Sequence, residues 1–155
     1  MGTERPPAAA VSLSAPMTIA NALDSPPTLE RQPIDRKKVC PMLLRLFCRR
    51  DNFHQPEEFD QGMTPIQDEL IVYTWWDATL AELSALICEV FAEYTECEFT
   101  FRHLFREAST GRIQQRHLGS HSKTHPGMAT LGEIGFLPGD YIDVCIKAAE
   151  RADAL

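Results

Sequence analysis

Histidines at a regular spacing are one set of residues whose type could support chemistry. Their positions are His117, His121 and His125. On a helix, an interval of four residues stacks three imidazoles on one face, as in a transition-metal site. Gly119, Pro126 and Gly127 interrupt a regular helix here, and no His-Glu-x-x-His pattern supplies a base. We therefore expect residues 119–128 to form a loop, with weak transition-metal binding as the alternative.

Cysteines and carboxylates are the other candidates for catalysis. The five cysteines are Cys40, Cys48, Cys88, Cys97 and Cys145. Their number is odd and no Cys-x-x-Cys pair occurs, so we expect reduced, packed thiols in place of a disulfide framework or a zinc site. Asp77, Asp140 and Asp143 are explained as a helix cap, a turn residue and a strand-surface residue. We therefore expect no enzyme and no cofactor.

Charge and composition exclude further classes of protein. The 155 residues include 15 Lys and Arg against 22 Asp and Glu, so the formal net charge is −7. This balance gives no overall basic field to attract a phosphate backbone. With 44% hydrophobic residues the chain can fill one globular core, and no apolar stretch is long enough to span a bilayer. We expect one soluble intracellular domain.

Local arginine clusters keep direct RNA binding open as an alternative. They comprise Arg45, Arg49 and Arg50 near one expected strand and Arg102, Arg106, Arg112 and Arg116 near two others, with aromatic residues between them. Arginines interleaved with aromatics are typical of auxiliary RNA contacts. The acidic balance favours the simpler interpretation of a solvated face.

Hydrophobic periodicity indicates the elements that position these residues. Alternation predicts strands at residues 39–48, 69–75, 98–105, 112–118 and 141–147, and a 3.6-residue period predicts a helix at 78–94. The predicted fold class is α+β: one helix laid across a mixed sheet with the first and last strands parallel at its centre, the β-grasp of ubiquitin-like domains. Residues 1–32 are expected to be a disordered arm, 33–147 the domain and 148–155 a tail.

An apolar outer face of the sheet is the feature most indicative of function. The helix covers one side only, yet Leu43, Phe47, Ile71, Tyr73 and Trp75 are expected on the other. Exposed apolar patches with aromatic and arginine anchors are typical of partner sites.

The rim of this patch and a long connection complete the expected partner site. Arg45 and Asp143 are the expected rim, and Phe53 and Phe59 of the connection have no evident core role. The alternative is that residues 33–34 and the connection fold back over the rings.

Several short motifs resemble a known family. They are Pro33-Ile34-Asp35-Arg36, Cys40-Pro41, Leu43-Leu44-Arg45, Tyr73-Thr74-Trp75, Asp77-Ala78-Thr79-Leu80, Glu82-Leu83 and Gly139-Asp140-Tyr141 with Asp143. Together they resemble the Sin-associated eighteen-kilodalton polypeptide family over residues 33–147.

This resemblance implies a non-catalytic nuclear adaptor with a ubiquitin-like domain. Its implied partners are subunits of the Sin and histone deacetylase co-repressor. In the apoptosis- and splicing-associated complex they are acinus or pinin and an RNA-recognition-motif splicing regulator, with RNA touched at most indirectly. The implied location is the nucleus, including nuclear speckles, with some protein in the cytoplasm and none in membranes.

Overall fold

The computed structural model describes residues 34–60 and 62–150. The predicted arm at 1–32 and the end of the predicted tail lie outside the described residues. In chain order the elements are β1 (Met42–Arg50), η1 (Pro56–Phe59), η2 (Ile66–Asp68), β2 (Glu69–Thr74), α2 (Leu80–Val90), η3 (Ala92–Tyr94), β3 (Cys97–Arg106), β4 (Ile113–His121) and β5 (Tyr141–Ala148). In this part of the chain no helix is long and apolar enough to cross a membrane.

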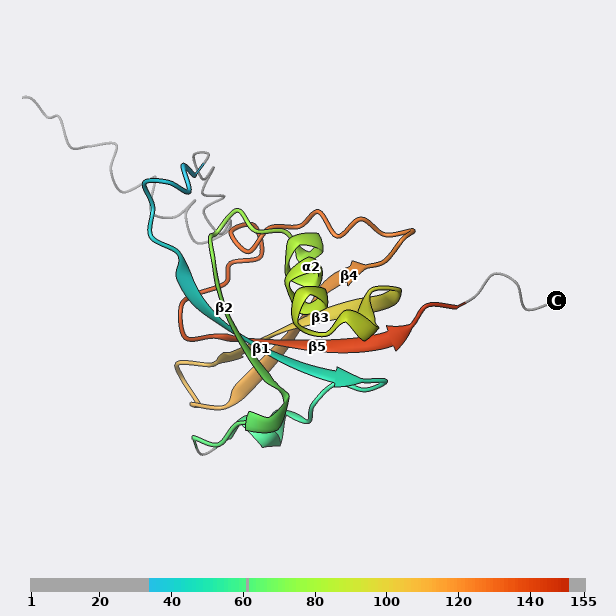
Figure 1. The fold of residues 1–155 in the computed structure, drawn as a ribbon. Helices are drawn as coiled ribbons and strands as arrows, with labels where there is room; N and C mark the ends of the chain where they lie inside the picture. Colours follow the sequence, from blue (N-terminus) through green and yellow to red (C-terminus); the bar gives the residue numbers. More distant parts are fainter. Residues whose placement is uncertain (1–33, 61, 151–155) are drawn as a thin grey trace, which may run out of the picture. The chain divides into compact units, whose positions relative to one another are not determined.

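The five strands form one sheet in the order β2-β1-β5-β3-β4 (Figure 1). Strands β1 and β5 pair in parallel at the centre, and the other neighbouring pairs are antiparallel. Helix α2 crosses one face of this sheet. The order of the elements and the central parallel pair confirm the predicted β-grasp fold.

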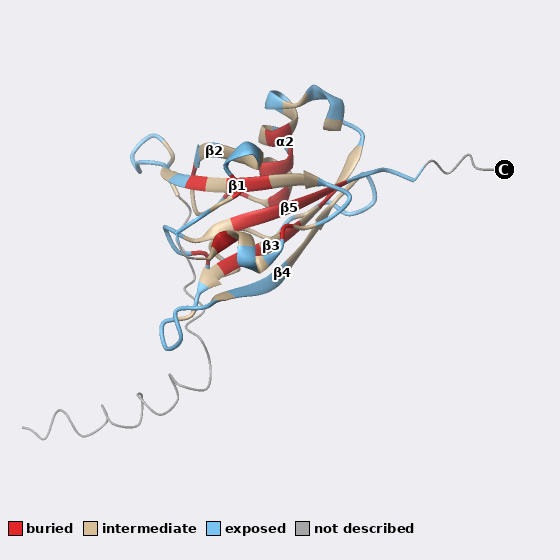
Figure 2. Ribbon diagram, turned by 90° about the horizontal axis from the view of Figure 1, so that it is seen from below, coloured by how far each residue is buried: buried red, intermediate tan, exposed pale blue. Residues whose placement is uncertain are grey.

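Alternation along the strands separates two faces. On the helix side, even-numbered residues of β1 and β5 meet the buried face of α2, whose core residues are Leu80, Leu83 and Ile87. Figure 2 shows β5 as the buried central strand and β4 as the exposed edge. The main core therefore lies between α2 and the middle of the sheet, where apolar burial drives folding.

The start of α2 corrects one prediction. The helix is capped by Thr79, whose side-chain oxygen accepts from the N–H of Glu82 at 3.1 Å. Asp77, the predicted cap, instead accepts hydrogen bonds from Arg36. The first two amides of the helix, on Leu80 and Ala81, donate to carbonyls of the β4–β5 connection. That connection therefore completes the helix start.

Strand β4 continues to His121, although residues 119–121 were predicted to be loop. The prediction was wrong for these three residues, because a glycine, a serine and a histidine pair with β3 as strand residues. In the structure the pairing register shifts between Phe101 and Arg102, and Gly119 adopts a φ of 134° in this bulge. A glycine there bends the strand without ending it.

Candidate protein-binding surface

The connection between β1 and β2 covers the middle of the outer face. Phe59 of η1 packs edge-on against Phe47 of β1, with ring centroids 5.0 Å apart, and also against Tyr141 of β5. With Leu104 of β3 these rings form a second small core. Phe47 is 0% exposed and Phe59 1% exposed, so the prediction that they contact a partner is wrong.

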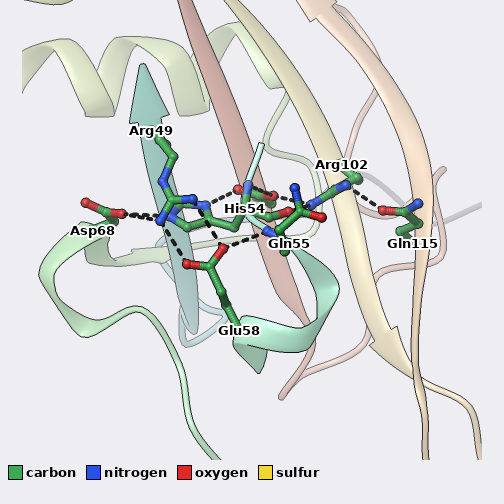
Figure 3. Close-up of polar contacts among 8 residues, drawn as sticks. Arg49, His54, Gln55, Glu58, Asp68, Arg102 and Gln115 are labelled. Atoms are coloured by element: carbon green, nitrogen blue, oxygen red, sulfur yellow. Dashed lines mark hydrogen bonds and ion pairs between the residues drawn. The ribbon is translucent and has the colours of Figure 1, made fainter. Parts of the chain in front are cut away.

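A buried ionic cluster fastens the same connection to the sheet (Figure 3). The carboxylate of Asp143 is fully buried and accepts from Nη2 of Arg102 at 2.5 Å. It also accepts from the backbone N–H of His54 at 3.0 Å and contacts Nδ1 of the same residue at 2.6 Å. The prediction that Asp143 lies on the strand surface, at the rim of a binding site, is therefore wrong. It is a structural anion under the connection.

Both ring nitrogens of His54 face carboxylates. Nε2 lies 2.8 Å from Oδ2 of Asp68, while Nδ1 contacts Asp143. Burial by itself lowers the pKa of His54, but the hydrogen bonds to Asp143 and Asp68 outweigh it, so the pKa is raised above its ordinary value. The imidazolium form donates from both nitrogens and satisfies this geometry.

Arginine pairs close the edges of this cluster. Arg49 donates to Glu58 at 2.9 Å and to Asp68 at 3.3 Å, which ties β1 to both short helices of the connection (Figure 3). Phe53, predicted to contact a partner, is half-buried, and the Arg102 guanidinium lies 4.6 Å from its ring centroid. The alternative of a connection folded over the rings is thus correct for the centre of the sheet.

The strip formed by Leu43, Ile71 and Tyr73 remains uncovered. These residues, named here the outer strip, are 44%, 52% and 65% exposed. Leu43 and Tyr73 are cross-strand partners in β1 and β2, and Ile71 stands opposite Arg45. The structure therefore brings Leu43 and Tyr73 of the predicted site together.

Arg45 occupies the boundary between the covered and uncovered parts of the face. It pairs with Glu69 and donates to the Thr64 hydroxyl at 3.3 Å, and its guanidinium lies 5.0 Å from the Tyr141 ring centroid. The hydrogen bond to Glu69 raises its pKa further, so the charge is permanent. Arg45 is a fixed cation beside the outer strip.

Trp75 is partly covered by the segment before β1. Its indole N–H donates to the Val39 carbonyl at 2.7 Å, and Arg36 lies 4.9 Å from its ring centroid. Arg36 in turn binds Asp77 and Glu82 at the start of α2. Trp75 therefore fixes the segment before β1 and contributes only part of its ring to the surface.

Two exposed apolar residues of the connection between β1 and β2 were missed by sequence reasoning. Met63 is 70% exposed, and Ile66, the first residue of η2, is 74% exposed. Their signal was available, because they are apolar residues in a mostly polar connection. They are exposed apolar residues of the connection that leads into β2.

The predicted metal alternative finds little support in the geometry. His117 and His121 belong to β4, whereas His125 follows in a turn. His121 bonds the Pro126 carbonyl, and His125 contacts Ser122 and Thr124. Within residues 34–60 and 62–150, no three His, Cys, Asp or Glu side chains are grouped to hold a metal ion.

The arginines of β3 and β4 are largely committed to internal contacts. Arg102 binds Asp143, and Arg116 donates to Nδ1 of His103 at 3.2 Å. Arg106 donates to the Gly111 carbonyl at 2.6 Å. These contacts reduce the number of guanidinium groups available to a phosphate backbone.

Known proteins with similar sequences span most of this domain. The family model for Sin3 associated polypeptide p18 (SAP18) matches residues 33–146. Human "Histone deacetylase complex subunit SAP18" is 37% identical over 127 residues, which cover 78% of this chain and 82% of that protein. The Arabidopsis thaliana protein of the same name is 35% identical over 129 residues, with coverage of 78% and 84%.

A similarity among solved structures is weaker. The C-terminal ubiquitin-like domain of mouse tubulin-specific chaperone e aligns with a TM-score of 0.37 and 10% identity, over 74% of this chain and 92% of that one. The sequence matches carry the assignment: this chain belongs to the Sin3 associated polypeptide p18 (SAP18) family.

Proposed function

We propose that this chain is a non-catalytic subunit of a nuclear histone deacetylase co-repressor complex. Relatives 35–37% identical over most of the chain carry the name "Histone deacetylase complex subunit SAP18". In this role the chain acts by binding other proteins.

The outer strip is the proposed contact with the complex, and its exposure is the observation that carries the proposal. Leu43, Ile71 and Tyr73 lie side by side on β1 and β2, while the connection covers Phe47 in the middle of that face. Burying such a strip against a partner removes apolar area from water, and a central aromatic residue is a typical energetic anchor. Arg45 at the boundary can orient the partner.

An adaptor also needs a second contact area. Met128 and Leu137 are 66% and 61% exposed in the connection between β4 and β5. This connection bonds the start of α2, so it belongs to the helix side of the sheet, opposite the outer strip. We propose this side for the second set of partners, the splicing-associated subunits that include an RNA-recognition-motif protein.

Membership in the complex is tested by purifying the tagged full chain from nuclear extract after nuclease treatment. Co-purified deacetylase activity that a deacetylase inhibitor abolishes supports the proposal. If activity is present only without nuclease, RNA carries the association, and the alternative of direct RNA binding replaces it. That alternative also predicts a steep loss of binding with salt.

A further inference from the structure

We propose that the partner at the outer strip binds as an added β-strand along the free edge of β2. The partner is an extended protein segment with apolar side chains at alternate positions and basic residues at its ends. This inference rests on the proposed function, because it specifies how the same surface is used.

Backbone directions in the sheet show which groups of β2 are free. The N–H of Asp51, just after β1, donates to the carbonyl of Ile146 in β5 at 2.9 Å. Alternate residues of a strand bond to opposite neighbours, and the register of β1 is continuous. The backbone N–H and C=O groups of odd-numbered β1 residues therefore point toward β5, and those of even-numbered β1 residues point toward β2.

The even-numbered residues of β1 pair with Leu70, Val72 and Thr74 of β2. The backbone N–H and C=O groups of the residues between these three point away from β1, toward the open edge of the sheet. The N–H of Glu69 is already used by the carbonyl of Ile66. Among the described residues, no hydrogen bond occupies the outward N–H and C=O groups of Ile71 and Tyr73. The side chains of Ile71 and Tyr73 are also exposed. One added strand can therefore bond to their free backbone groups and pack on their side chains.

The edge of β2 lacks the usual protection against pairing. Edge strands are commonly blunted by Pro, charged side chains or bulges. Strand β2 reads Glu-Leu-Ile-Val-Tyr-Thr, with a regular register and one charge, Glu69, that Arg45 neutralises.

The other edge strand is protected. Strand β4 exposes Gln114, Gln115, Arg116 and His117 and carries the register shift. The contrast indicates that β2 is kept open for a partner strand, a recognised mode of peptide binding.

Charge decides between a partner segment and a second copy of this chain. Residues 34–150 contain 12 Lys and Arg against 18 Asp and Glu, a net charge of −6. Two copies therefore repel each other, whereas a segment with Lys or Arg at its ends is attracted. Its alternate apolar side chains pack on Ile71 and Tyr73.

A random library of 12-residue peptides displayed on phage, selected on the full chain, tests the kind of partner. We expect enriched sequences with alternating apolar residues, terminal Lys or Arg and no central Pro. Apolar residues at helical spacing overturn the proposal. Such peptides suit the groove of about 750 Å³ beside α2, lined by Ala81, Ala85 and Cys88 among others.

The binding mode is tested with a selected peptide and two variants at one position. Ile71→Ala shortens the side chain and keeps the N–H; Ile71→Pro also removes the N–H that faces away from β1, where proline is tolerated. We expect Ile71→Pro to bind at least tenfold more weakly than Ile71→Ala. Equal affinities for the two variants contradict strand addition.

Amide hydrogen exchange in the unaltered chain keeps the test decisive if Ile71→Pro does not fold. We expect the amides of Ile71 and Tyr73 to exchange rapidly when free and to become protected in the complex. Unchanged exchange with bound peptide overturns the proposal. Sedimentation tests the alternative occupant, a second copy of this chain. If the unaltered chain forms a dimer and Ile71→Pro does not, the edge of β2 pairs with a second copy and the choice of a partner segment is wrong.

The two proposals fail in distinguishable ways. If Ile71→Pro folds and retains deacetylase activity on purification while Tyr73→Ala loses it, the outer strip binds the complex by side chains alone. If neither variant changes the co-purified activity, the proposed contact surface itself is wrong.

Discussion

Removing the buried charge of Asp143 should destabilise the domain strongly. Asp143→Asn preserves the side-chain shape but leaves Arg102 without its anion and His54 with only one of its two carboxylate partners, Asp68. Asp143 is fully buried and accepts from both residues, and Nε of Arg102 already has no partner among the described residues. Breaking a buried ion pair by removing one partner costs about 3–5 kcal/mol. That is a large share of the ~5–15 kcal/mol that stabilises a typical domain.

Urea unfolding of the two proteins measures this loss directly. The matched control is Asp60→Asn, because Asp60 is 43% exposed and lies 4.0 Å from Arg106. A surface pair of this kind contributes about 0–1 kcal/mol. If Asp143→Asn loses no more stability than Asp60→Asn, the ionic cluster does not hold the connection on the sheet.

The pH dependence of the same measurement tests the charge state of His54. Its pKa is raised in the folded chain above the ordinary value of about 6.5. The stabilisation is therefore complete below that ordinary value and is lost as the pH rises through the folded pKa. In Asp143→Asn this loss should shrink, because the carboxylate that stabilises the imidazolium is gone.

Three further predictions concern the core, the helix start and the thiols. Phe59→Ala removes a ring that is 1% exposed, and we expect a loss of about 3–5 kcal/mol in urea unfolding, with a loss below 1 kcal/mol arguing against a second core. Thr79→Ala removes the cap of α2 and should cost about 1 kcal/mol, whereas Thr79→Ser should restore most of it in the same assay. Burial raises the pKa of Cys48 to about 12, whereas Cys40 is exposed. Mass spectrometry after brief alkylation at pH 8 should therefore find Cys40 modified and Cys48 intact. Rapid modification of Cys48 in the folded chain would contradict this packing.

The fold was largely predictable because its strands and helix follow simple periods. Leu44 and Leu46 alternate with outward residues in β1, and Leu80, Leu83 and Ile87 repeat at helical spacing. These patterns depend on local geometry, which the sequence expresses directly.

The binding surface was only partly predictable, because alternation does not say what covers a face. Phe47 points to the outer side as expected, yet Phe59 returns from the connection to bury it. Asp143 looked like a surface residue because its partner His54 lies 89 positions away in the chain. Phe59 in a polar connection was the available signal for the second core.

The most direct test of the account compares the deacetylase activity that co-purifies with the tagged full chain and with two variants. Tyr73→Ala removes the most exposed residue of the outer strip, and Val90→Ala removes a comparably exposed residue of α2. If Tyr73 anchors the partner, its loss costs about 2 kcal/mol, or a roughly 30-fold weaker association. We expect Tyr73→Ala to lose the activity while it unfolds in urea like the unaltered chain, and Val90→Ala to retain it. Full activity with a folded Tyr73→Ala variant would contradict the central claim that the outer strip binds the complex.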